Sequence, residues 1–346
     1  MSAIDFSKFC QWEASQINGQ EPTLIERCLV DLSKGYPEIE YLLKKDGVGC
    51  VPRGDLQMIV GPQKSGKTFA SMIFEIALLS GGCMGFEAQQ ENLKILHVDT
   101  EQHRNSVADK NVKLLSLAGY PVDQNHPRLN VLTVKELSPS DRLTVVEEAV
   151  KVFRPDFVLI DGIRDLVTDF NNVEQSTNVM NVLMRLCSMY NCAIMSVIHQ
   201  NKGKGRDKDD NPRGHLGTEL MNKCSEGYYV TKSVGSPVTV SQKISRNAPI
   251  SDWYFHIDDE GKPEIASGPL TPKELKSIEV WENFKLIFAN HDKLRHSELA
   301  KEYVKLTGLS DSTAKNHIKS ASQEGVLTHD GKYYSYLFPP YEEPTE

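Results

Sequence analysis

The sequence predicts an α/β fold built on a mostly parallel central sheet, and three observations predict it. Short apolar segments alternate with helical patterns between residues 56 and 198, as in a parallel sheet covered by helices on both faces. The first of these segments runs directly into the glycine-rich stretch GPQKSGKT, at 61–68. The chain has 346 residues, of which 39% are hydrophobic, and this is enough for a sizeable core.

The expected elements follow one another in a regular order. Each apolar segment is bounded by polar or turn residues, so we expect strands at 56–60, 94–98, 129–134, 156–160 and 193–198. Helical patterns lie between them, at 67–79, 105–118, 140–153 and 175–190. Beyond residue 226, β-rich segments separated by turn residues predict a hairpin-rich edge to the sheet, with strands at 228–233, 237–245 and 253–258.

Composition also divides the chain into a large and a small unit. Residues 1–45 are expected to form an N-terminal helical segment, because apolar residues recur there at helical spacing. The large α/β domain is expected to cover 46–262. Proline and glycine concentrate in 263–274, which predicts a linker. A separate small domain follows at 275–338, and 339–346 form a tail.

Charge and hydropathy limit the class of protein. The net charge is −8, so any contact with nucleic acid must come from local basic patches. No apolar segment approaches the roughly 18 residues of a membrane span, and the N-terminus lacks the pattern of a signal peptide. The seven cysteines form no CxxC pair, which favours reduced thiols over a zinc site. We therefore expect a cytoplasmic protein without a membrane partner.

The stretch GPQKSGKT has the spacing of a phosphate-binding loop between a strand and a helix. Glycine lets the backbone turn its N–H groups toward phosphate oxygens, and the helix N-terminus adds a favourable dipole. Lys67 can reach the β- and γ-phosphates, and the hydroxyl of Thr68 can bind Mg²⁺. The alternative is a chance match in a glycine-rich turn, and the flanking strand and helix argue against it. The expected nucleotide-binding residues are Gly61, Pro62, Gln63, Lys64, Ser65, Gly66, Lys67 and Thr68.

Acidic residues follow two other predicted strands, at the sheet edge where ligands bind in open parallel sheets. Asp161 ends the aliphatic strand FVLID and fits the role of a second magnesium ligand. A helix-capping or turn aspartate is the alternative. Glu101 lies in HVDTEQ, at 97–102, where a glutamate can act as a general base on the attacking water. A solvated loop acid is the alternative there.

These motifs, in this order, resemble the RecA-like ATPases. The resemblance covers roughly residues 45–260 and is strongest to the RepA-type hexameric helicases of plasmids and mobile elements, and to their AAA-family relatives. It rests on GPQKSGKT, DTEQ, LIDGIRDL, and the H-Q-x-K run at 199–202 followed by Arg213 and Gly214. It implies a RecA-like ATPase core with ATP as substrate, Mg²⁺ as cofactor, Glu101 as general base, and a homo-oligomer in the form of a hexamer.

The same resemblance implies a γ-phosphate sensor at His199 or Gln200, the end of the last core strand. Ordinary hydrogen-bonded polar residues are the alternative. The charged stretch that follows has no helical or strand periodicity from 201 to 220, and such motors hold a loop for single-stranded DNA at this position. Interleaved acids make a solvated surface loop the alternative. The residues expected to contact single-stranded DNA in the 201–213 loop are Lys202, Lys204, Arg206 and Arg213.

The stretch QKISRNAP, at 242–249, resembles the lysine-and-arginine strand of DnaB-like ring helicases. In that family a basic residue reaches the γ-phosphate held by the neighbouring subunit. This catalytic role maps first onto Arg246 and second onto Lys243. The family has one residue between its two bases, whereas this chain has two. The alternative is a basic pair that protects an edge strand from aggregation.

The C-terminal segment predicts three helices in 280–325 and then a hairpin around an Asp-Gly turn. This resembles a winged helix-turn-helix. Lys315 and Lys319 share one side of the third helix, and together with His317 they are expected to contact duplex DNA. The charge of 271–336 is nearly balanced, with ten basic and nine acidic residues, so docking to a protein is the alternative.

Taken together, the motifs predict an ATPase that drives a DNA motor, a ring-forming replicative helicase or translocase of a plasmid or mobile element. An ATP-switched DNA-binding regulator or assembly factor, without processive unwinding, is the alternative. A signalling ATPase resembling KaiC is a more distant one. The motor predicts strong stimulation of ATP hydrolysis by single-stranded DNA, whereas the switch predicts little.

Overall fold

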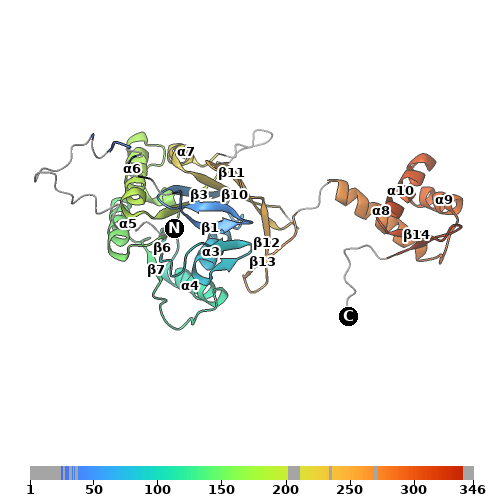
Figure 1. Cartoon of the computed structure of the whole chain (residues 1–346), viewed down its shortest axis with the longest axis horizontal. Coiled ribbons are helices and arrows are strands. Elements are labelled where there is room, and N and C mark those ends of the chain that lie inside the picture. The colour runs from blue at the N-terminus through green and yellow to red at the C-terminus, as the bar shows by residue number, and fades with distance from the viewer. Residues whose placement is uncertain are drawn as a thin grey trace, which may run out of the picture. The chain divides into compact units, whose positions relative to one another are not determined.

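The computed structural model describes residues 38–201, 211–233, 236–268 and 272–337, together with isolated positions between 25 and 35. The chain separates into two compact units, with the boundary after Gly268 (Figure 1). Most of the predicted N-terminal helical segment lies outside the described residues.

The larger unit is built on a sheet of nine described strands in the order β13-β12-β11-β10-β3-β9-β8-β6-β7. Its core strands pair in parallel and include β10, which pairs in parallel with β3. The parallel strands are β3 (Leu56–Gly61), β6 (Ile95–Asp99), β7 (Leu129–Thr133), β8 (Phe157–Asp161), β9 (Ala193–His199) and β10 (Glu226–Lys232). The antiparallel edge comprises β11 (Val238–Ser245), β12 (Trp253–Ile257) and β13 (Pro263–Ile265). The predicted α/β fold with a mostly parallel central sheet is confirmed.

Helices cover both faces of this sheet (Figure 1). Every residue of β3 and β8 is buried, as expected for strands between two helical layers. One hydrophobic cluster joins Ile59 to α3 and α4, and the other joins Met58 to α5, α6 and α7. The helices are α3 (Lys67–Ser80), α4 (Arg104–Leu117), α5 (Pro139–Phe153), α6 (Val173–Tyr190) and α7 (Gly214–Lys223). Packing on both faces therefore holds the parallel strands in place, and with them the edge of the sheet where their carboxyl ends lie.

A small second sheet packs against this unit, and most of it was not expected from the sequence. Its order is β2-β1-β5-β4, with β1 (Tyr41–Lys45), β2 (Val48–Pro52), β4 (Gly82–Cys83) and β5 (Phe86–Ala88). Phe86 contacts Phe74 of α3 and Trp253 of β12, with ring centroids 5.0 and 5.1 Å apart. Residues 41–45 are therefore strand rather than the end of a helical segment, because Leu42 and Leu43 are buried in this sheet.

Two other segments differ from the predictions. Residues 263–265, placed in the linker by their prolines and glycines, form β13, where Pro263 pairs opposite Ile257 at the sheet edge. An edge position tolerates proline because no ladder hydrogen bond is lost there. Helix α7 begins at Gly214, inside the stretch without periodicity. Leu216 and Leu220, four residues apart, bury one side of this short helix.

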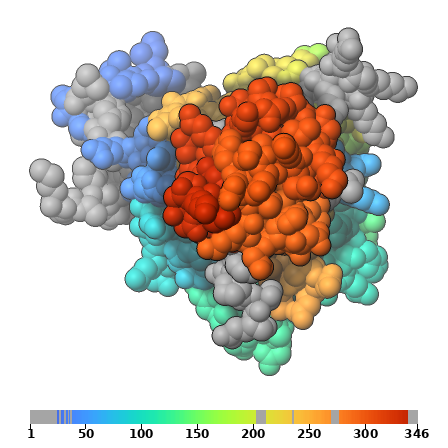
Figure 2. All heavy atoms as spheres, turned by 90° about the vertical axis from the view of Figure 1, so that its right-hand side faces the viewer, coloured from blue at the N-terminus to red at the C-terminus, as the bar shows by residue number. Residues whose placement is uncertain are grey.

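The smaller unit has three helices and a hairpin, and Figure 2 shows its surface in orange and red. They are α8 (Pro272–Phe288), α9 (His296–Thr307), α10 (Asp311–Gln323), β14 (Leu327–His329) and β15 (Tyr334–Tyr336). Phe284 and Tyr303 are fully buried in a hydrophobic core of its own, with ring centroids 4.8 Å apart. None of the helices in the described ranges is long and apolar enough to cross a membrane.

Candidate active site

The phosphate-binding loop joins the end of β3 to the start of α3. Gly66 caps α3 with a φ of 99°, a conformation that favours glycine. A Cβ on Gly61 would lie 2.3 Å from the carbonyl oxygen of Val230 on the neighbouring strand, so only glycine fits there. Steric constraints therefore explain why glycine occupies both of these positions of the motif.

A pocket of about 310 Å³ opens at this loop. Its walls are the loop itself, the carboxyl ends of β8 and β9, and the turn after β6. The residues around it are Lys64, Ser65, Gly66, Lys67, Thr68, Phe69, Glu101, Gln102, Asp161, Gly162, Arg164, Val197, Ile198, His199 and Ile257. Five residues that the sequence singled out for separate roles are thus brought to one pocket: Lys67, Thr68, Glu101, Asp161 and His199.

Lys67 is buried at the base of the pocket. Its ammonium donates hydrogen bonds to the carbonyl oxygens of Gly61, at 3.0 Å, and Pro62, at 2.6 Å. It also lies 3.2 Å from Nδ1 of His199. Burial lowers the pKa of Lys67 to about 8, while the carboxylates of Asp161 and Glu101 act in the opposite direction. A phosphate in this pocket would favour the charged ammonium in the same way.

Glu101 faces His199 across the pocket, with Oε1 3.8 Å from Nε2. The Glu101 side chain is 44% exposed, so water can reach it. Partial burial raises the pKa of Glu101, and the nearby carboxylates of Asp161 and Asp165 raise it further. A higher pKa makes a carboxylate a better proton acceptor. Glu101 is therefore suited to take a proton from water at the mouth of the pocket.

A buried aspartate orients the Glu101 backbone. Oδ1 of Asp99 accepts hydrogen bonds from the backbone N–H groups of Glu101, at 3.0 Å, and Gln102, at 2.7 Å. On its other side, Lys110 of α4 donates to Oδ2 of Asp99, at 3.0 Å, and to Oδ2 of Asp161, at 3.3 Å. Neither Asp99 nor Lys110 was assigned a role from the sequence. Asp99 is the first residue of the D-x-E pattern, and this position could have indicated its importance.

Of the two predicted sensors, His199 lines the pocket and Gln200 lies just beyond it. The chain leaves β9 after His199, and residues 211–213 lie beside this end of the strand. The Asn201 N–H donates to the carbonyl of Asn211, and the Arg213 N–H donates to the carbonyl of His199. These hydrogen bonds measure 3.0 and 2.9 Å. The residues on either side of 202–210 are thus held together at the edge of the pocket. Among the predicted DNA contacts, Lys202, Lys204 and Arg206 lie outside the described residues.

Arg213 is described, and its guanidinium lies over the ring of Phe170, 4.9 Å from the centroid. This stacking places Arg213 against the body of the domain. Any contact of Arg213 with DNA would have to be made from this position.

Arg246 and Lys243 do not line the pocket of this chain. Strand β11 begins at Val238, whose side chain packs beside Gly66, and it ends just before Arg246. The Arg246 backbone N–H donates to the carbonyl of Ser225 at 3.0 Å, at the start of β10. Lys243 lies over the ring of Tyr229, 4.8 Å from the centroid. Arg246 is therefore at the opposite end of the sheet from the phosphate loop of the same chain.

In the C-terminal unit, Lys315 and Lys319 border one open hollow of about 510 Å³. Lys315 also pairs with Asp311, at 2.7 Å. The structure places His317 elsewhere on α10, because its Nδ1 lies 2.9 Å from the hydroxyl of the buried Tyr303. The His317 ring therefore packs toward α9 and does not border this hollow, and its contact with DNA stays a prediction.

The fold and this site define a P-loop ATPase. A profile of the AAA domain family matches residues 29–205, just over half of the chain. The chain belongs to the AAA domain family. No curated protein matches it. Among solved structures, the crystal structure of the RadB recombinase is similar at 16% sequence identity with a TM-score of 0.46, covering 64% of this chain and 94% of that chain.

Proposed function

We propose that this ATPase is a DNA motor, a ring-forming replicative helicase or translocase of the RepA/DnaB-like type from a plasmid or mobile element. The observation that carries the proposal is the attachment of the 202–210 segment. Its flanking residues Asn201 and Asn211 are hydrogen-bonded to each other, and Arg213 is hydrogen-bonded to His199, which lines the phosphate pocket. A change in the pocket can therefore reach a segment rich in lysine and arginine without passing through another element.

The pocket residues supply the chemistry of hydrolysis. Thr68 and Asp161 present a hydroxyl and a carboxylate to the same pocket, which are oxygen ligands of the kind that Mg²⁺ prefers. Thr68 and Asp161 would hold Mg²⁺, and a bound Mg²⁺ would neutralise part of the negative charge of the phosphates. Lys67 binds the β- and γ-phosphates as a point charge. Glu101 takes the proton of the water that attacks the γ-phosphorus, and His199 beside it senses whether the phosphate is present.

The position of Arg246 supports assembly into a ring. In one subunit the sheet separates Arg246 from the phosphate loop, so it cannot act on the ATP that its own chain binds. We propose that it reaches the γ-phosphate held by a neighbouring subunit, with Lys243 as the second candidate. Repeating such a head-to-tail contact closes a ring, and a hexamer is the form we propose.

Stimulation by single-stranded DNA tests the motor directly. The ATPase rate of the full chain is expected to rise with single-stranded DNA, and changing Lys202, Lys204 and Arg206 to glutamine should remove the increase but keep the basal rate. Removing positive charge weakens the hold on the DNA backbone. Changing the exposed Lys135 to glutamine is the control. A wild-type rate that does not respond to single-stranded DNA would reject the motor.

Mixing two inactive variants tests the proposed ring. Arg246→Ala lacks the finger and Glu101→Gln lacks the base, so each is expected to be nearly inactive alone. In mixed rings some interfaces combine an intact Glu101 with an intact Arg246 from the neighbour, and ATPase activity should partly return. The control is Lys223→Ala, a change beside Arg246. This variant should keep the ATPase activity of the wild type, both alone and in mixtures. Absence of recovery on mixing, in rings shown to exchange subunits, would contradict an action of Arg246 on its neighbour.

The C-terminal unit is proposed to be a winged helix-turn-helix that binds duplex DNA through α10. Changing Lys315 and Lys319 to glutamine should weaken duplex binding and reduce the slope of log K against log salt by about 0.9 for each phosphate that is no longer neutralised. Lys301 and Lys305 are also exposed and four residues apart, on α9, and changing both gives the matched control. An unchanged salt slope in the Lys315 and Lys319 variant would favour protein docking instead.

An ATP-switched DNA-binding regulator is the second candidate. Asp207, Asp209 and Asp210 lie among the bases of the 201–213 loop and weaken its attraction for DNA, which favours this interpretation. The regulator would bind duplex DNA in an ATP-dependent manner. It would show neither stimulation by single-stranded DNA nor strand displacement. The ATPase assay with single-stranded DNA therefore separates the two candidates.

A further inference from the structure

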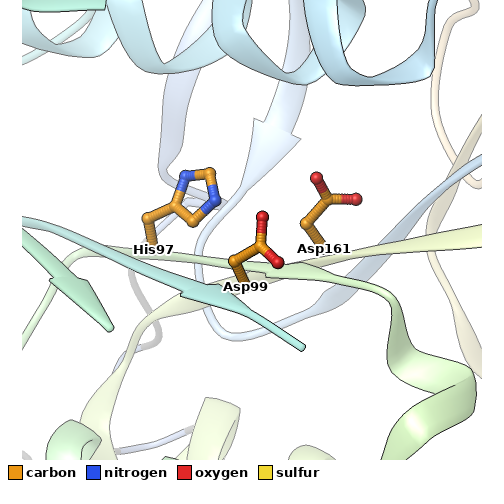
Figure 3. A group of neighbouring side chains, drawn as sticks. All are labelled: His97, Asp99 and Asp161. Atoms are coloured by element: carbon orange, nitrogen blue, oxygen red, sulfur yellow. The ribbon is translucent and has the colours of Figure 1, made fainter. Parts of the chain in front are cut away.

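Behind the ATP pocket, three buried side chains converge from neighbouring strands. His97 and Asp99 lie on β6, and Asp161 ends β8, which pairs with β6 in parallel. One ligand atom from each of the three lies within 4.8 Å of the others. Figure 3 shows one ring nitrogen of His97 directed toward the two carboxylates. The three residues therefore form a cluster of one imidazole and two carboxylates.

The histidine of this cluster is held in the manner of a metal ligand. Its Nδ1 lies 2.9 Å from Oε1 of Glu75, a buried carboxylate on α3. Its Nε2 is buried and has no hydrogen-bond partner among the described residues. The His97 residue is only 7% exposed. A carboxylate on one ring nitrogen fixes the imidazole so that the other nitrogen can bind a metal.

The charges around the cluster also suit a cation. With a neutral imidazole, the carboxylates of Glu75, Asp99 and Asp161 outnumber the single ammonium of Lys110 by two negative charges. A cavity of about 10 Å³ borders His97, Glu75 and Lys110, but neither Asp99 nor Asp161 lines it. The Lys110 ammonium already bridges Asp99 and Asp161, at 3.0 and 3.3 Å, so this place accepts positive charge.

We propose that His97, Asp99 and Asp161 bind a divalent transition-metal ion, in a site that the Lys110 ammonium closes when the metal is absent. Mixed imidazole and carboxylate ligands suit Mn²⁺, Fe²⁺ or Zn²⁺ better than Mg²⁺, which prefers oxygen ligands. Bonds of about 2.2 Å place ligand atoms at most about 4.4 Å apart, so the cluster needs to contract by only a few tenths of an ångström. The site shares Asp161 with the proposed Mg²⁺ site, but it needs no nucleotide.

Mn²⁺ binding to the nucleotide-free full chain tests the proposal without any substitution. One Mn²⁺ per chain is expected, and pulsed electron paramagnetic resonance should detect nitrogen coupling from an imidazole. His256→Gln, which removes an exposed histidine, should leave that coupling unchanged. Absence of Mn²⁺ binding, or Mn²⁺ binding without nitrogen coupling, would overturn the proposal.

Substitutions then assign the ligands. His97→Gln should weaken Mn²⁺ binding at least tenfold and remove the nitrogen coupling, and Glu75→Gln should weaken it by about 10–100-fold. Lys110→Gln should strengthen Mn²⁺ binding because it removes the competing ammonium. Lys113→Gln on the same helix, whose lysine pairs with Asp109 instead, should behave as wild type.

The Mg²⁺ site of the proposed ATPase is distinguished by Thr68→Ala. Without nucleotide this variant should retain the Mn²⁺ affinity and the nitrogen coupling of the wild type. Thermal unfolding of each variant checks that it is folded. Equal Mn²⁺ affinity in folded His97→Gln and wild type, or loss of the nitrogen coupling in Thr68→Ala, would overturn the proposal. The ATPase response to DNA is a separate measurement, so either proposal can fail alone.

Discussion

Replacing Lys67 with alanine is expected to weaken ATP binding by about 10–150-fold. The Lys67 ammonium lies at the base of the phosphate pocket, where its present partners are the carbonyl oxygens of Gly61 and Pro62. Hydrogen bonds to charged groups contribute about 1.5–3 kcal/mol, which corresponds to this range of affinity. Titration calorimetry with a non-hydrolysable ATP analogue measures the loss. Lys135→Ala changes an exposed lysine that does not line the pocket, and this control should retain the affinity of the wild type.

The same lysine predicts how ATP affinity depends on pH. Burial lowers the pKa of Lys67 to about 8, and phosphate binds the protonated ammonium. ATP affinity of the wild type should therefore fall as pH rises above 8, by up to about tenfold per pH unit, because each bound ATP requires a proton on the lysine. The Lys67→Ala protein has no such group and should show a flat profile above pH 8. Parallel profiles in the two proteins would contradict this assignment.

Replacing Glu101 with glutamine is expected to reduce ATP hydrolysis by about 10²–10⁴-fold while ATP binding changes little. Glutamine keeps the shape of the side chain but cannot accept the proton of the attacking water, and general-base catalysis contributes about this factor. Single-turnover hydrolysis measures the chemical step, and the calorimetric assay measures binding.

The control for Glu101→Gln is Glu136→Gln, which changes an exposed glutamate that does not line the pocket. It should leave both hydrolysis and binding unchanged. Hydrolysis by Glu101→Gln within a few-fold of the wild type would mean that another group accepts the proton. His199, 3.8 Å away, would then be the first residue to replace.

Much of the larger unit could be predicted because its core strands are mostly apolar and are separated by amphipathic helices. Half of the small sheet could not be predicted, since β4 has two residues and β5 has three. Strands this short show no periodic pattern in the sequence. Helix α7 was missed because only Leu216 and Leu220 form its buried side. Short elements of this kind depend on the surface that they pack against, which local sequence does not contain.

For the candidate site, motifs identified single residues but gave no information about the network between them. Lys67 and Asp161 follow from their strands, because a phosphate loop and an acidic strand end have fixed positions in a parallel sheet. The role of Lys110 depends on how α4 lies against β6 and β8, and the Glu75–His97 contact depends on α3 crossing above β6.

The position of β3 in the middle of the sheet has a consequence for how the chain folds during synthesis. Strand β3 carries the phosphate loop and is made early, but its two neighbours, β9 and β10, are made more than a hundred residues later. At cellular rates of elongation this delay is on the order of 10–30 s. Through that interval both edges of a mostly apolar strand lack their native partners, so a nascent chain is exposed to aggregation. A ribosome-bound chain that ends before β10 should therefore depend on chaperones and should not yet bind ATP.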